Sequence, residues 1–254
     1  MSLILYFIAL LSYPFGQDVV VVKHHAAAPS GITYIAGACS GNPTNSNHQN
    51  DITGLNTTGA NFLVIGATTN PAAYGQTPAI VVSDSTSVNT WTPLTQVVYP
   101  TSSAVVQLFY AQNATGSSSQ NFRMLDSMST PSYPTFCVMA FSGVKTSGAL
   151  DAGTDLQSYT SIAQATIQTA SVTPGTGKQL VITTAGNDCC RAIYATSIDS
   201  SFLPATPIYA GGIGLFSNSL SYLIQASGAT VHPTWTFLNA TGYLASSIAA
   251  FAGK

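Results

Sequence analysis

The adjacent pair His24-His25 is the densest cluster of titratable side chains in this sequence. Neighbouring residues of a strand point to opposite faces, so the two imidazoles do not converge on one metal ion, and we interpret the pair as part of a solvated linker. The other histidines are isolated: His48 lies in a polar segment and His232 precedes a proline. The histidines therefore predict no metal site and no catalytic base.

Two carboxylates lie close together in the segment Asp151-Ala-Gly-Thr-Asp155. Carboxylates bind Ca²⁺, but the spacing is not that of an EF-hand, and the chain contains no glutamate to close such a loop. A glycosidase needs two carboxyl groups with different roles, and nothing singles out two of the eight acidic residues. No Gly-x-Ser-x-Gly motif occurs. We therefore expect a turn at this segment, no cofactor and no enzymatic activity.

The four cysteines are typical of an oxidising compartment. Cys39 and the adjacent pair Cys189-Cys190 lie in stretches with loop-like composition, whereas Cys137 lies in an apolar run. The composition predicts a disulfide from Cys39 to Cys189 or Cys190, and sequence alone does not choose between them. Cys137 is predicted to be a small buried apolar residue.

Charge is scarce throughout the chain. Six basic and eight acidic residues make up 6% of the 254 residues, against roughly 25% in ordinary soluble domains. The basic residues are scattered and form no stripe that would neutralise a run of phosphates, which argues against nucleic acid as a partner. The surface is expected to be neutral and rich in Ser, Thr, Asn and Gln.

The first 16 residues form an uncharged, signal-like apolar segment. Its apolar run, residues 3–11, is shorter than the roughly 20 residues needed to span a bilayer. The length suits the apolar region of a secretory signal, although the usual basic start is missing. We expect a secreted, cell-surface protein without a membrane span; whether residues 1–16 are cleaved stays open.

Short strands separated by turn-forming residues dominate the rest of the chain. Three segments recur in order, with offsets of 118, 113 and 110 residues: 58–65 matches 176–182, 108–115 matches 221–228, and 136–143 matches 246–253. This repeat predicts an all-β fold over residues 32–254, a single jelly-roll-like β-sandwich made of two pseudo-repeated Greek-key halves. Chance similarity among apolar strands is the alternative.

The segments 59–66, 82–94, 106–113, 141–151 and 177–182 carry a likeness that extends over about residues 32–253. In these segments the chain resembles a functionally uncharacterised β-sandwich domain of secreted bacterial surface proteins. The resemblance implies secretion and a jelly-roll-like sandwich, and it implies no catalytic residues. Independently of it, the side chains of Asp84 and Asn89 predict a turn, after which Trp91 begins a new strand.

An N-terminal arm, residues 17–31, precedes the predicted sandwich and contains the four valines Val19, Val20, Val21 and Val22. Such a segment pairs readily with an open sheet edge. If it pairs with a neighbouring subunit, the contact is head-to-tail and propagates a fibre. If it forms the first strand of its own sandwich, no fibre follows. The arm leads us to predict a structural subunit of an extracellular filament or surface assembly, with copies of itself as partners.

The alternative function is a secreted carbohydrate-binding or adhesive module, because the chain has 12 tyrosines that could form a flat platform for sugars. Three sequons, at Asn56, Asn113 and Asn239, are also candidate sites for covalent glycans.

Overall fold

The computed structural model describes residues 31–41, 48–70, 77–99, 104–128, 132–187, 195–210, 217–238 and 242–254. Every regular element in these ranges is a β-strand, and all strand pairs are antiparallel. The predicted all-β class is therefore confirmed.

The first half of the chain forms two sheets. The inner sheet has the strand order β1-β9-β3-β7-β5, with β6 also paired to β7, and the outer sheet has the order β2-β8-β4. The inner strands are β1 (Thr33–Gly41), β3 (Phe62–Thr69), β5 (Thr92–Pro93), β6 (Val97–Val98), β7 (Val105–Gln112) and β9 (Thr135–Ser142). The outer strands are β2 (Gln49–Leu55), β4 (Ile80–Asp84) and β8 (Gln120–Asp126).

The second half repeats this arrangement, with the inner order β10-β17-β12-β15-β14 and the outer order β11-β16-β13. The inner strands are β10 (Leu156–Tyr159), β12 (Gln179–Asn187), β14 (Leu203–Ala210), β15 (Asn218–Gln225) and β17 (Leu244–Ala252). The outer strands are β11 (Thr166–Gln168), β13 (Ala195–Ile198) and β16 (Thr234–Phe237).

Strand pairing is nested in the same way in both halves. If β5 and β6 are treated together as the fifth strand of the first half, each half has eight strands. In each, the first strand pairs with the eighth, the second with the seventh and the third with the sixth. These are pairings that a jelly roll contains. The pairing of fourth and fifth strands, which would complete it, does not occur: the fifth strand lies beside the sixth instead.

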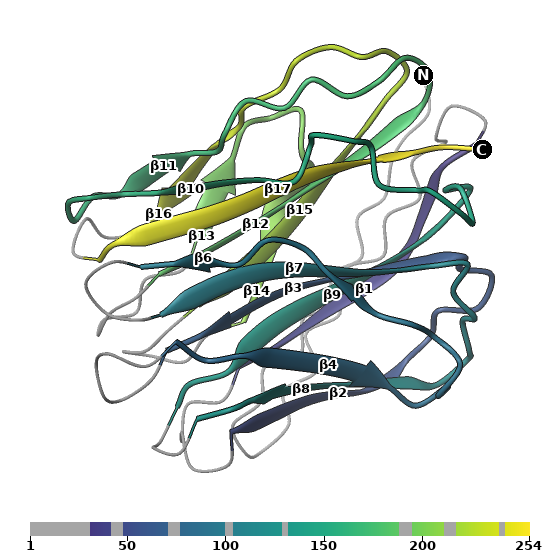
Figure 1. Cartoon of the computed structure of the whole chain (residues 1–254), viewed down its shortest axis with the longest axis horizontal. Coiled ribbons are helices and arrows are strands. Elements are labelled where there is room, and N and C mark those ends of the chain that lie inside the picture. Colours follow the sequence, from purple (N-terminus) through teal and green to yellow (C-terminus); the bar gives the residue numbers. More distant parts are fainter. Residues whose placement is uncertain are drawn as a thin grey trace, which may run out of the picture.

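The four sheets stack as four layers (Figure 1). One apolar cluster lies between the two inner sheets, a second fills the first half between its inner and outer sheets, and a third fills the second half in the same way. The prediction of a single sandwich therefore needs correction, because each half supplies both layers of its own sandwich. The repeat itself is confirmed, but each repeated unit has eight strands, whereas the predicted Greek-key halves would have four each.

The structure also corrects one of the three sequence matches. Val64 pairs with Tyr110, and the equivalent Ile182 pairs with Tyr222, so β7 and β15 correspond with an offset of 112 rather than 113. A shift of one residue exchanges the two faces of a strand. With the corrected offset, Leu108 matches Leu220, and both lie in the cluster between the inner sheets.

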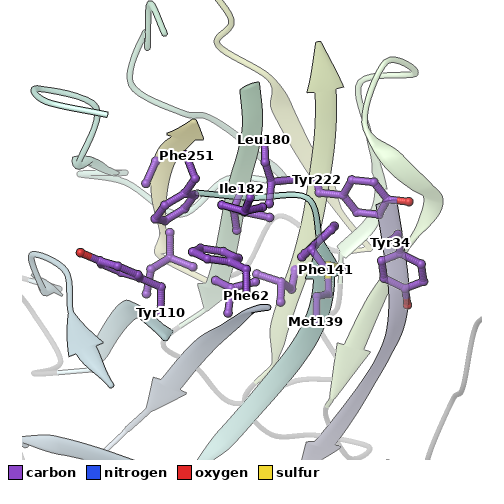
Figure 2. Packing of buried hydrophobic residues seen from close by; sticks show 14 of the residues in the cluster. Tyr34, Phe62, Tyr110, Met139, Phe141, Leu180, Ile182, Tyr222 and Phe251 are labelled. Carbon is purple, nitrogen blue, oxygen red and sulfur yellow. The ribbon is translucent and has the colours of Figure 1, made fainter. Parts of the chain in front are cut away.

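Aromatic rings fill the space between the inner sheets (Figure 2). Phe62 of β3 contacts Phe251 of β17 with ring centroids 4.7 Å apart. Tyr34 and Tyr222 stack at 5.2 Å, with Phe141 edge-on to both. Burial raises the pKa of Tyr34, and raises that of Tyr222 to about 12.

At two positions of this interface, a glycine of one half faces a threonine of the other half. A Cβ on Gly66 would lie 2.8 Å from Thr184 Cβ, and one on Gly186 would lie 2.5 Å from Thr68 Oγ1. Each glycine thus faces the threonine at the equivalent position of the other half. The Asn218 amide joins the two, donating to Thr68 Oγ1 at 2.8 Å and to Thr184 Oγ1 at 3.0 Å. The inner sheets can approach closely at these two positions because a glycine of one half faces a threonine of the other.

A disulfide joins Cys39 to Cys137. The two cysteines lie opposite each other on β1 and β9, with Cα atoms 4.0 Å apart. The predicted bridge from Cys39 to Cys189 or Cys190 is therefore wrong. Cys137 is buried, as predicted, but it is a disulfide partner and not merely a small apolar residue. Strand register, which composition does not reveal, sets the pairing. Cys189 and Cys190 lie outside the described residues.

Candidate functional site

The valine segment Val19 to Val22, predicted to drive assembly, lies outside the described residues, as do His24 and His25. The described chain begins beside its C-terminal end. Ile32 Cδ1 lies 3.1 Å from where a Cβ of Gly253 would be, and the Lys254 N–H donates to the Gly143 carbonyl at 2.9 Å. The arm therefore joins the fold at this end of the molecule.

The outward face of the sheet β2-β8-β4 combines polar and apolar side chains. Arg123 Nε donates to Asp51 Oδ1 at 2.7 Å, and this hydrogen bond raises the pKa of Arg123. Val81 and Leu125 are paired across β4 and β8, and their side chains are 58% and 38% exposed. The ion pair also borders a shallow depression. This face offers an exposed apolar strip beside a neutralised pair of charges.

Asp84, at the end of β4, organises the turn that the sequence predicted. Its carboxylate accepts hydrogen bonds from the Thr86 N–H at 2.9 Å, Asn89 Nδ2 at 3.2 Å, Trp91 Nε1 at 2.9 Å and Gln120 Nε2 at 3.0 Å. The lone pairs of the carboxylate are thereby occupied. The turn over these residues is confirmed, and the hydrogen bonds to the Asp84 carboxylate hold it in place.

A cluster of Asp126, His48 and Ser132 is the group closest to catalytic chemistry. His48 Nδ1 lies 3.1 Å from Asp126 Oδ1 and 3.0 Å from Ser132 Oγ, and Thr69 Oγ1 donates to Asp126 Oδ2 at 2.6 Å. A nucleophilic serine needs one ring nitrogen while the carboxylate holds the other. Here both groups meet the same nitrogen, so the cluster ties together chain segments and provides no proton relay.

The sequence contains no signal for this cluster, because His48 is 78 residues from Asp126 and 84 from Ser132. The structure also revises its surroundings. Gln49 to Asp51, which belong to the polar segment around His48, begin strand β2, whose Ile52 and Leu55 point into the core.

Asp151 and Asp155 bond to different partners. Asp151 Oδ2 accepts from the Gly175 N–H, whereas Asp155 Oδ2 accepts from the Thr95 N–H at 2.8 Å and Thr95 Oγ1 at 2.6 Å. The predicted turn forms between them at residues 152–153. In the described part of the chain, no three His, Cys, Asp or Glu side chains group as metal ligands would. Asp155 instead ties the segment between the halves to the first half.

Two of the three sequons lie in the described structure. The Asn56 side chain is exposed, and its Oδ1 accepts from the Thr58 N–H at 3.1 Å. Asn113 is exposed in a turn, with a φ of 52°. Asn239 lies outside the described residues. Glycosylation at these sites stays a prediction.

The aromatic residues mostly serve the core. Trp235 is fully buried and donates from Nε1 to Thr183 Oγ1 at 3.2 Å, and Trp91 bonds to Asp84. Among the exposed large apolar side chains in the described ranges, Tyr159, at 55% exposure, is the single aromatic. The described surface therefore does not present several flat rings side by side.

Comparisons with protein-family models, curated proteins and solved structures found no match for this chain. No helix with the length and hydropathy needed to cross a bilayer occurs among the residues that the structure describes.

Proposed function

We propose that this protein is a structural subunit of an extracellular filament or surface assembly, and that copies join by strand addition through the arm segment Val19 to Val22. The observation that carries the proposal is the stack of four open sheets. Each sheet ends in two edge strands, and an edge that no other described segment covers has backbone groups that can pair with an added strand.

The charge distribution supports the same function. With 14 charged residues, six basic and eight acidic, the chain has little electrostatic repulsion to keep its copies apart. The described ion pairs are few, and Arg123 and Asp51 neutralise each other on the outer sheet. Copies of this protein can therefore approach closely at low energetic cost.

The point where the arm meets the described chain is exposed, because Gly31 faces solvent beside the C-terminal strand. Eight residues lie between Val22 and Gly31, so the nine steps from one to the other span at most about 30 Å when extended. A carbohydrate-binding module is less well supported, since a sugar platform would need more exposed rings than Tyr159 supplies.

Electron microscopy of the full chain and of a variant lacking residues 1–31 tests the proposal. We expect linear assemblies from the full chain and isolated particles from the shortened one. A second variant, Val20→Asp with Val22→Asp, keeps the arm but removes its apolar character, and it should behave like the deletion. Isolated particles from the full chain at high concentration would overturn the proposal.

A further inference from the structure

Among the described residues, the fourth strand of the first half pairs on one side only. In the second half, β14 contacts β13. In the first half, β5 and β6 pair with β7, and among the described strands β4 pairs with β8 alone. The outer sheet β2-β8-β4 therefore ends at β4, at the place where a complete jelly roll would have one more strand.

The hydrogen bonds next to β4 show which of its peptide groups face this edge. The Ser127 N–H donates to the Ala79 carbonyl at 3.0 Å, and the Ser85 N–H donates to the Asn121 carbonyl at 2.9 Å. Bonding to one neighbour alternates along an antiparallel strand, so Ala79, Val81, Ser83 and Ser85 bond to β8. The N–H and C=O groups of Ile80 and Val82 then point away from β8, toward the open edge.

The other edge of this sheet is protected, whereas β4 has no strand partner on its free side among the described residues; just before β4, Gln96 Nε2 donates to the Pro78 carbonyl at 2.9 Å. Strand β2 has an irregular register between Ile52 and Leu55 and carries Asp51, bonded to Arg123; bulges and charges are common defences against unwanted pairing. Strand β4 pairs with β8 in a regular register, and its first four residues are uncharged. Val81 stands exposed in the middle of it.

We propose that the edge of β4 accepts the segment Val19 to Val22 of a second copy, an assignment that rests on the proposed function and adds the acceptor to it. Four uncharged residues, Ile80 to Ser83, match the four valines in length. Alternate valines would extend the exposed row that Leu125 and Val81 begin. The other two would cover Ile80 and Val82, which lie at the rim of the first-half core.

Thiol cross-linking between two full-length variants tests this contact. Both carry Cys189→Ser and Cys190→Ser; one, isotopically labelled, adds Val20→Cys in the arm, and the other adds Ser83→Cys on β4. The matched control replaces Ser83→Cys by Gln168→Cys, an exposed position on the edge strand β11 of the other outer sheet. Mass spectrometry then quantifies the mixed dimer. We expect at least ~10-fold more mixed dimer with Ser83→Cys than with the control.

A second pair of variants leaves cysteine chemistry aside. Val81→Lys places a charge beside the incoming valines, and Val88→Lys places the same charge at a more exposed position, 67% against 58%, beyond the end of β4. We expect Val81→Lys to raise the concentration needed for assembly by about tenfold and Val88→Lys to leave it unchanged.

The outcomes separate the two proposals. Assemblies that form without cross-links at Ser83→Cys, or that tolerate Val81→Lys, would overturn the assignment of β4 and leave strand addition standing at another edge. A full chain that stays monomeric at every concentration would overturn both.

Discussion

The two halves of the molecule share one pattern of strand pairing but fill their interiors differently. In the first half Ala67 pairs with Phe136, and at the equivalent place in the second half Ala185 pairs with Ser246. Phe136 is fully buried within an apolar cluster. The Ser246 hydroxyl is also buried and has no hydrogen-bond partner in the described structure. The nested pairing therefore tolerates the exchange of a large ring for a hydroxyl.

The outer sheet of the first half also has longer strands than the outer sheet of the second half. Strands β2, β8 and β4 have seven, seven and five residues, whereas β11, β16 and β13 have three, four and four. The hydroxyls of Ser219 and Ser221 join that of Ser246 as buried groups without a partner among the described residues. The disulfide lies in the first half. We infer that the first half contributes more of the stability and that the second half depends on packing against it.

The largest expected effect tests the first-half interior. Phe136→Ala removes a buried ring from the apolar cluster, and we expect it to lower the free energy of unfolding by about 3–5 kcal/mol. Denaturant titration followed by fluorescence measures this. A loss of under about 1 kcal/mol would show that the first half is no better filled than the second.

The next effect concerns the contact that joins the halves. Gly66→Ala introduces a methyl group against Thr184, and we expect a loss of about 1–3 kcal/mol in the free energy of unfolding. Because the closest clash is with Thr184, while Leu220 Cδ1 lies 3.0 Å from the added methyl group, Thr184→Gly should restore part of the loss in the double variant. Equal losses with and without Thr184→Gly would contradict the reciprocal packing.

Alkaline pH should weaken the same interface. Burial raises the pKa of Tyr222 to about 12, above the value of about 10 for an unfolded tyrosine, so the folded state favours the neutral phenol. The raised pKa of Tyr222 contributes fully to the free energy of unfolding below pH ~10. The contribution is lost as the pH rises from there through ~12, at up to about 1.4 kcal/mol per pH unit. Urea titrations from pH 9 to 12 measure it.

The control for that experiment is Tyr222→Phe, which keeps the stacked ring but removes the ionising group. The free energy of unfolding of this variant should fall less steeply with rising pH than that of the unsubstituted protein. The same slope in both proteins would assign the alkaline loss to other groups.

The smallest expected effect has the opposite sign. Ser246→Ala and Ser219→Ala each remove a buried hydroxyl that has no protein partner in the described structure, and we expect each to raise the free energy of unfolding by about 1 kcal/mol. Thr183→Ala is the matched control, since its hydroxyl accepts from Trp235, and it should be destabilising. Destabilisation by both serine variants would show that these hydroxyls are satisfied in solution.

The sequence predicted the strands and the repeat, but it did not predict that each repeat forms both layers of its own sandwich. Apolar runs such as 62–68 and 179–185 are buried on both faces, so they indicate strands without showing which face meets which sheet. The offset of β7 was wrong by one for the same reason, since Val105 to Ala111 are all buried. A strand in which buried and exposed residues alternate, such as β8, does show which of its faces meets the core.

The turn at Asp84 was predictable because its partners are mostly local, with Thr86, Asn89 and Trp91 within seven residues. The disulfide and the cluster around Asp126 were not. Their members come from β1 and β9, or from segments 78 and 84 residues apart, and meet only through strand register. For the same reason the open edge of β4 emerges from topology and not from its own five residues.

Sedimentation velocity of the full chain over a concentration series, beside the variant Val20→Asp with Val22→Asp, tests strand addition most directly. The account predicts species that grow without a fixed size as the concentration of the unsubstituted protein rises, and a single 26.2 kDa species for the variant. A single 26.2 kDa species for both proteins, or equal growth in both, would contradict it.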